Sequence, residues 1–350
     1  MKKWLPQLLI FFGSLFLYTL TLAPSVPYQG DSGELITVAY TLGIAHPPGY
    51  PLYTMLAHLF TYLPINSVAW RVNFFSALTS SLTLIFVYQI IFTLTKKKFV
   101  ALITAGIIGL SQTFWLYSVV AEVFSLNNLF VTIVIYLAVL IDKNTTDHDL
   151  KKQFYLLSAI FGLSLSNHST MVFIIPGLLY FLWPKIKKVF GFKFFIIVCL
   201  TCAAGLLPYL FILFRAKTAI LPVAWSYPEN FYDLLRIMIR ADYGTFSPAL
   251  NLNPAMATIS DKADQLSKFF SYFIEDFGWS VGILSAVGLL TGIRKKLRIT
   301  IFLAIFFFLS GIFFISYANF PIDDPSGFGL VCVERFYLLP YLIAGLLSGL

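Results

Sequence analysis

Two carboxylates near the N-terminus have the residue types and spacing for acid–base chemistry. Asp31 and Glu34 lie in Tyr28-Gln29-Gly30-Asp31-Ser32-Gly33-Glu34, directly after the apolar run of residues 4–24. If a helix begins at Ser32, Asp31 stands at its N-cap and Glu34 could close a capping box, which would make both residues structural. Ionisable groups at a membrane surface are, alternatively, candidates for function. We therefore predict Asp31 as a catalytic base supported by Glu34, with helix capping as the competing interpretation.

Three arginines are candidates for binding a phosphate. Arg215 and Arg335 lie at the ends of apolar runs on the side of Asp31, and Arg71 begins another run. A guanidinium group matches the geometry of phosphate oxygens, and the rest of this side is acidic. Snorkelling at the membrane boundary is the alternative for each arginine.

Four further residues complete the predicted cavity. Glu122 falls in a tight turn between two apolar runs, where a carboxylate needs a partner such as His168 or an arginine. His46 and Tyr50 belong to the turn His46-Pro47-Pro48-Gly49-Tyr50-Pro51. Histidines and carboxylates on one side could bind a divalent metal, but their spacing matches no metal motif. We therefore predict these residues as cavity lining, with no metal site and no cofactor.

The composition indicates a protein whose solvent is lipid. Of 350 residues, 59% are hydrophobic and 11% are charged, and the mean hydropathy is +0.83. Soluble domains average about 25% charged residues. The net charge of +8 would suggest nucleic acid as a partner of a soluble protein, but here the basic residues cluster between apolar runs. We expect a lipid bilayer and no nucleic acid as partner.

Ten apolar runs are candidates for crossing about 30 Å of hydrocarbon, with an uncertainty of about two. The uncertainty arises because Asn167-His168-Ser169 divides two short runs that could form one bent or re-entrant pair. The expected fold is an all-α polytopic helical bundle of roughly ten spans. The runs are 4–24, 69–94, 99–117, 119–141, 154–166, 170–183, 192–214, 278–293, 299–317 and 336–350.

The charges between the runs predict an orientation. With a cytoplasmic N-terminus on an uncleaved first helix, the inner segments hold 16 of the 24 basic residues, as the positive-inside rule requires. The outer segments then include two long stretches, residues 25–68 with a short helix from Ser32 to Gly43, and residues 215–277 as a lid. We expect one domain over residues 1–350. Because the chain ends inside an apolar run at Leu350, we also expect a longer natural protein.

Several different short motifs occur in order between residue 28 and residue 340. They are Gly30-Asp31-Ser32-Gly33-Glu34, His46-Pro47-Pro48-Gly49-Tyr50-Pro51, Arg71-Val72-Asn73, Ala121-Glu122-Val123-Phe124-Ser125-Leu126, Arg215-Ala216, Ala224-Trp225, Tyr243-Gly244 and Glu334-Arg335-Phe336-Tyr337-Leu338. Together they resemble the domain of unknown function 2723 family, also classed as glycosyltransferase family 117, which includes O-mannosyltransferases of plexin-type ectodomains.

The resemblance implies a GT-C fold, an inverting glycosyltransferase and a polyprenyl-phosphate sugar as donor. Mannose is one candidate for the sugar. It also implies Asp31 as general base with Glu34 in support, and contacts from Arg215 and Arg335 to the donor phosphate. The acceptor would be a hydroxyl of a protein or glycan on the external face. If the source is bacterial, the membrane would be the inner (plasma) membrane.

Two other classes of protein fit the hydrophobicity. A transporter or flippase of lipid-linked glycans would show internal repeats and polar groups at mid-membrane. The apolar runs here hold almost no ionisable residues, and no internal repeat is apparent. A structural membrane scaffold would explain the topology, but not the acidic and basic residues collected on the outer side.

Overall fold

The structure is a computed structural model that describes residues 4–27, 30–218, 220–245, 258–295, 297–318, 320–322 and 328–350. Tyr28 and Gln29 before the first motif, and residues 219 and 246–257 of the predicted lid, lie outside this part of the chain.

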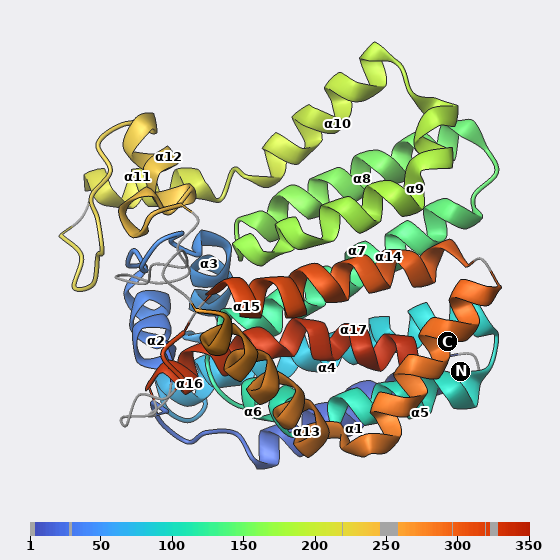
Figure 1. The fold of residues 1–350 in the computed structure, drawn as a ribbon. Coiled ribbons are helices and arrows are strands. Elements are labelled where there is room, and N and C mark those ends of the chain that lie inside the picture. Colours follow the sequence, from blue (N-terminus) through green and yellow to red (C-terminus); the bar gives the residue numbers. More distant parts are fainter. Residues whose placement is uncertain are drawn as a thin grey trace.

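Nearly all of the described chain is helical, and Figure 1 shows the helices gathered in one elongated bundle. The elements are α1 (Leu5–Leu20), α2 (Ser32–Thr41), α3 (Pro51–Phe60), α4 (Val68–Thr95), α5 (Lys98–Gly109), α6 (Gln112–Ser118), α7 (Val123–Lys143), α8 (Asp147–Leu165), η1 (Ser169–Ile174), α9 (Ile175–Val189), α10 (Phe192–Gly205), α11 (Tyr209–Thr218), α12 (Phe231–Met238), η2 (Ala241–Tyr243), α13 (Ile259–Arg294), α14 (Arg298–Phe307), η4 (Phe308–Phe313), α15 (Phe314–Ala318), α16 (Phe328–Glu334), η5 (Arg335–Tyr337) and α17 (Leu338–Ser348).

The prediction of roughly ten spans is not confirmed. Among the described residues, six helices are long and apolar enough to cross a membrane, or up to eight if each of two bent pairs counts as one span. The bent pairs are α5–α6, with a bend of 69°, and α10–α11, with a bend of 40°. The run 4–24 forms only the 16-residue α1, and the run 154–166 is the apolar part of α8, which begins with charged residues.

The predicted break at Asn167-His168-Ser169 separates two antiparallel helices. α8 ends just before it and η1–α9 follows it, and the far ends of α8 and α9 meet again. There Lys185 Nζ donates to the Asn144 carbonyl at 2.6 Å, and Lys188 Nζ lies 2.6 Å from Asp147 Oδ1. The two apolar runs therefore form a hairpin.

The basic loops and the acidic first loop lie at opposite ends of the bundle. Lys143 at the end of α7 donates to the carbonyl of Thr93 at the end of α4, close to the contacts of Lys185 and Lys188. Figure 1 shows α2, α3, α12 and α16 together at the left end, away from the loop that joins α9 to α10. This arrangement segregates the charges as the sequence predicts.

The predicted lid is shorter than its sequence boundaries. Residues 215–277 were expected to be outside the helical bundle, but α13 begins at Ile259 with a capping box between Thr258 and Asp261. Gly278 interrupts this long helix with a φ of 69°, so the predicted start of the span marks a kink within a helix. The described remainder of the lid, residues 220–245, packs on the turn between α2 and α3.

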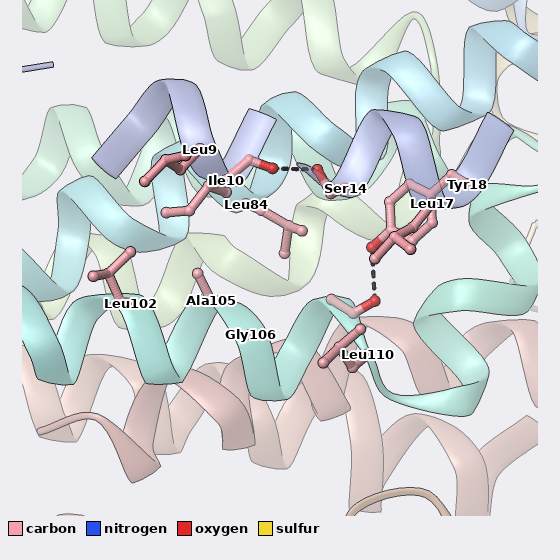
Figure 2. Close-up of a pocket in the computed structure, with 11 residues that line it drawn as sticks. Leu9, Ile10, Ser14, Leu17, Tyr18, Leu84, Leu102, Ala105, Gly106 and Leu110 are labelled. Atoms are coloured by element: carbon pink, nitrogen blue, oxygen red, sulfur yellow. Dashed lines mark hydrogen bonds between the residues drawn. The ribbon is translucent and has the colours of Figure 1, made fainter. Parts of the chain in front are cut away.

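Two apolar cavities lie among the spanning helices. A cavity of about 180 Å³ separates α1 from α5, and Figure 2 shows Tyr18 crossing it to donate its hydroxyl to the Gly109 carbonyl at 2.7 Å. A larger cavity of about 420 Å³ lies between α8, α9 and α10 and is lined almost wholly by apolar side chains.

Close helix packing at α8–α10 gives a test of this arrangement. A Cβ atom at Gly162 of α8 would collide with the Cys202 carbonyl of α10, so Gly162→Val should force the helices apart. We expect a loss of about 2 kcal/mol, measured as a lower thermal unfolding temperature in detergent. Gly106→Ala is the control, because nothing lies within 4 Å of a Cβ there. Equal stability of the two variants would contradict the packing.

Candidate active site

Four segments that are distant in sequence converge at the end of the bundle that holds α2 and α16. Asp31 is the N-cap of α2, the turn of residues 46–50 leads into α3, Glu122 is the N-cap of α7, and Arg335 begins η5. Ser32 fixes the first segment on the third, because its Oγ donates to the Ala121 carbonyl at 2.9 Å. The sequence-predicted residues Asp31, Glu122 and Arg335 are therefore brought together.

Arg335 bridges two carboxylates. Its Nη1 lies 2.5 Å from Asp31 Oδ2 and 3.4 Å from Glu122 Oε1. Its guanidinium also faces the rings of Phe124 and Phe336, at 5.8 and 6.0 Å from their centroids. A cation held in this way by charge and by aromatic faces has a fixed position.

Glu122 is the buried member of the cluster, with 1% of its side chain exposed. Its Oε1 accepts from the Asp31 backbone N–H at 3.1 Å, and its Oε2 has no hydrogen-bond partner among the described residues. Burial raises the pKa of Glu122 to about 7, against the opposing effect of Arg335. Of the two partners predicted for Glu122, His168 or an arginine, the structure shows the arginine, which is Arg335.

Gly30 allows Asp31 to reach this cluster. Its φ is +66°, and a Cβ atom at this position would collide with Glu122 Oε1. The glycine is therefore required both by the backbone conformation and by the close approach of the Glu122 carboxylate.

The predicted capping box at the start of α2 does not form. Asp31 occupies the N-cap, but its side chain makes no capping hydrogen bond. The Glu34 carboxylate instead binds His46 twice, with Oε1 2.7 Å from the backbone N and Oε2 2.9 Å from Nδ1. The helix does begin at Ser32 with Asp31 at its N-cap position, as predicted, but the capping box is wrong, because both side chains are used in tertiary contacts.

The remaining predicted cavity residues surround His46. Tyr50 OH lies 3.0 Å from His46 Nε2, and the Tyr50 ring stacks on the His168 ring with centroids 5.8 Å apart. Burial and the neighbouring arginines lower the pKa of His168 to about 3, so its imidazole is neutral. Burial raises the pKa of Tyr50, so its hydroxyl stays protonated.

The other two predicted phosphate ligands cap helices in the structure. Arg215 Nε and Nη2 donate to the carbonyls of Leu42 and Thr41 at the end of α2, at 2.8 and 3.1 Å. Arg71 donates to the carbonyls of Thr61 and Leu63 after α3. These contacts satisfy carbonyls that a helix end leaves open. A role in phosphate binding stays a prediction for both arginines.

The lid adds two residues that the sequence analysis did not select. Ile44 pairs with the lid through an isolated parallel bridge to Ala224, which places the Trp225 ring 5.9 Å from the His46 ring. Arg240 of the lid is near enough to act on the pKa of Tyr50 and of His168. Ala224-Trp225 had appeared as a motif, but its contact with His46 depends on the fold.

Among the described residues, no group of three or more His, Cys, Asp or Glu side chains has the geometry to hold a metal ion. Cys199 and Cys202 are free cysteines on α10. Independence from metals and cofactors stays a prediction.

The raised pKa of Glu122 predicts a pH-dependent stability. Because folding favours the protonated form, the stabilisation is complete below pH 4.5 and is lost as the pH rises through about 7. The variant Glu122→Gln stays neutral, so its thermal unfolding temperature should exceed that of the wild type by about 5 °C more at high pH than at low pH. Glu229→Gln, at an exposed lid carboxylate, is the control. A difference that stays constant with pH would refute this assignment.

Comparison with known proteins identifies related chains. Residues 31–189 match the family model of the protein O-mannosyl-transferase TMEM260 N-terminal domain. Protein O-mannosyl-transferase TMEM260 of Mus musculus is 33% identical over 340 residues, which are 95% of this chain and 47% of the relative. The Dictyostelium discoideum protein of the same name is 29% identical, over 98% of this chain and 44% of the relative. The chain thus spans less than half the length of these relatives.

Two solved structures share the fold. ArnT from Cupriavidus metallidurans, bound to undecaprenyl phosphate, superposes with a TM-score of 0.66 over 98% of this chain and 59% of ArnT, at 11% identity. The Archaeoglobus fulgidus oligosaccharyltransferase gives a TM-score of 0.53 over 96% of this chain and 48% of that protein, at 14% identity. The chain is therefore a multi-pass membrane protein with the fold of ArnT, and its sequence is similar to the TMEM260 N-terminal domain in the region that contains Asp31, His46 and Glu122.

Proposed function

We propose that this protein is a member of glycosyltransferase family 117 that transfers a sugar from a polyprenyl-phosphate donor to a hydroxyl group. Mannose is the candidate sugar, because the similar curated proteins are O-mannosyltransferases. A polyprenyl-phosphate donor is supported by the undecaprenyl phosphate bound to ArnT, which has the same fold. A protein hydroxyl is the candidate acceptor, because the same similar proteins are named as protein O-mannosyl-transferases.

The observation that carries the proposal is the pairing of Asp31 with Arg335 at one end of the bundle. Asp31 is the most exposed carboxylate of the cluster, at 28% of its side chain, and is held 2.5 Å from the guanidinium. A sugar that leaves on a phosphate needs no proton from the enzyme, so the remaining tasks are to deprotonate the acceptor and to stabilise phosphate charge. Asp31 supplies the base and Arg335 supplies the cation.

The stereochemistry follows from this division of roles. The acceptor oxygen would lie about 3 Å from Asp31 and attack the anomeric carbon from the side opposite the phosphate. The new bond forms in one displacement, so the configuration at the anomeric carbon inverts.

The donor lipid needs apolar surface close to the charged cluster. The cavity between α8, α9 and α10 includes Phe161 of α8, and His168 follows in the break just after that helix. A prenyl chain in this cavity would leave its phosphate on the side of His168 and Arg335. This placement of the prenyl chain in the cavity is part of the proposal.

The segregation of charge supports an orientation. Basic loops cluster at the end of the bundle opposite Asp31, and by the positive-inside rule this supports a cytoplasmic N-terminus and a site on the external face. In a bacterial cell this membrane would be the inner membrane.

Asp31→Asn tests the base. The variant should fold and retain donor binding, but transfer should fall by at least about 10³-fold, because the amide accepts no proton. The assay incubates membranes with a panel of polyprenyl-phosphate sugars and follows hexose gain by mass spectrometry. Glu229→Gln should leave transfer unchanged. Wild-type turnover by Asp31→Asn would remove Asp31 from the mechanism.

Arg335→Gln and Arg215→Gln separate a phosphate ligand from a helix cap. Loss of Arg335 should weaken donor binding by about 10- to 100-fold, as for a lost charged hydrogen bond. Loss of Arg215 should lower the thermal unfolding temperature, because two carbonyls of α2 lose their donor, while donor affinity is retained. Binding titrations and melting curves of both variants make the comparison. Equal weakening of donor binding would show that both arginines contact the phosphate.

A further inference from the structure

We propose that His46 is a proton relay for Asp31: it receives from Asp31 the proton that the acceptor hydroxyl loses. His46 does not contact the reacting atoms and acts through Asp31. This inference rests on the proposed glycosyl transfer and adds a second base to it.

Glu34 fixes which nitrogen of His46 can accept a proton. An ionised carboxylate only accepts hydrogen bonds, and Glu34 Oε2 lies 2.9 Å from Nδ1, so Nδ1 carries the hydrogen. The lone pair is then on Nε2. The second Glu34 oxygen accepts a hydrogen bond from the His46 backbone N–H at 2.7 Å, which fixes the position of His46 relative to Glu34. A carboxylate that orients a histidine in this way also stabilises the imidazolium that forms.

Nε2 of His46 faces the catalytic carboxylate. It lies 3.7 Å from Asp31 Oδ2 and 3.0 Å from Tyr50 OH. Since the Tyr50 hydroxyl stays protonated, it donates to Nε2 in the resting site and can rotate away when a proton arrives. Arg335 also lies beside Asp31, but it cannot act as the relay, because its guanidinium is already fully protonated and cannot accept a proton.

Burial makes an internal acceptor useful. The His46 side chain is 14% exposed and that of Glu34 is 17% exposed, and the Trp225 ring of the lid covers His46 from one side. His46 and Glu34 thus form a largely buried pair directly beside the more exposed Asp31.

The step balances without a further reactant. The acceptor oxygen bonds to the anomeric carbon, and the bond from that carbon to the phosphate oxygen breaks with its electron pair leaving on the phosphate. The hydroxyl proton passes to Asp31 and then to His46 Nε2. His46 later releases the proton to water and returns to the neutral form beside the Glu34 carboxylate.

The charged and titratable groups around His46 come from all the packed segments. Asp31 and Glu34 belong to α2, Glu122 precedes α7, and Arg335 belongs to η5. Tyr50 lies before α3, and Arg240 with Tyr243 lies in the lid. His168 is neutral, as described above. The neutral form of His46 is the active one, so protonation of the ring should reduce turnover as the pH falls.

The chain contains a matched control for the His–Tyr pair. His58 and Tyr62 have the same spacing as His46 and Tyr50, and their ring centroids are 4.9 Å apart, against 5.0 Å for the first pair. His58 Nε2 lies 2.9 Å from Tyr62 OH, but its Nδ1 faces the Ala39 carbonyl at 2.7 Å. The carboxylates on either side of His46 therefore distinguish the two histidines.

The experiment uses the full chain in proteoliposomes, with undecaprenyl-phosphate mannose as donor and a Ser/Thr-rich peptide as acceptor, from about pH 5 to 8.5. His46→Gln and Glu34→Gln should each lower kcat by about 10²-fold with donor KM unchanged, and His46→Gln should lose the acid limb of the wild-type pH profile. Glu34→Gln should lower kcat because its amide N–H would donate to Nδ1 of His46. The ring hydrogen would then be on Nε2, which could no longer accept a proton. His58→Gln should match the wild type.

Chemical rescue separates the relay from a structural role. In folded His46→Ala protein, free imidazole should restore part of kcat, and it should not raise the kcat of His58→Ala. A His46→Gln variant with the kcat and pH profile of His58→Gln would overturn the relay, as would folded His46→Ala protein that imidazole does not rescue. Full activity of Asp31→Asn would instead refute the proposed base, so the two failures are distinguishable.

Discussion

The ion pair between Arg335 and Asp31 joins segments that are 304 residues apart in the sequence, and the site depends on it. Asp31 reaches the guanidinium because Gly30 has a positive φ and no side chain to collide with Glu122. Arg335 is in turn fixed by Phe124 and Phe336, so α2, α7 and η5 share one charged centre. Any displacement of the segment that carries Asp31 would separate its carboxylate from the Arg335 guanidinium.

Two kinds of interaction hold the parts of the site that do not touch Arg335. The Glu34 carboxylate attaches the turn of residues 46–50 to α2, and the bridge between Ile44 and Ala224 attaches the lid to that turn. Arg215 closes the assembly by donating to the last carbonyls of α2. The lid therefore rests on the backbone of α2, whose first turn carries Asp31.

The helices could be predicted from the sequence, because a backbone in lipid must satisfy its hydrogen bonds internally and a long apolar run does so by forming a helix. The number of membrane spans could not be predicted in the same way. The bends in α5–α6 and α10–α11 depend on packing, and the charged start of α8 leaves too little apolar length. Likewise, α13 begins at Ile259, far inside a stretch whose polar composition indicated a loop.

The site shows the same limit at the level of single residues. Composition and position selected Asp31, Glu34, Glu122 and Arg335, but local rules also offered Glu34 a capping box, which the structure lacks. A capping box is a contact within one turn, whereas His46 lies 12 residues from Glu34 and offers both a backbone N–H and a ring nitrogen. The three arginines were also equivalent in sequence. Only the fold shows that Arg71 and Arg215 face helix-end carbonyls and that Arg335 faces carboxylates.

The charge balance of the cluster explains how such a site could admit an anion. With Asp31 and Glu122 both ionised, the single charge of Arg335 would be fully offset, and a phosphate would meet net negative charge. Burial raises the pKa of Glu122 to about 7, and protonation of Glu122 would leave Asp31 as the one carboxylate that counters the charge of Arg335. A donor phosphate would then approach a guanidinium whose charge is offset by one carboxylate instead of two. The protonation state of the buried Glu122 carboxylate thus sets the net charge of the cluster that Asp31 and Arg335 form with it.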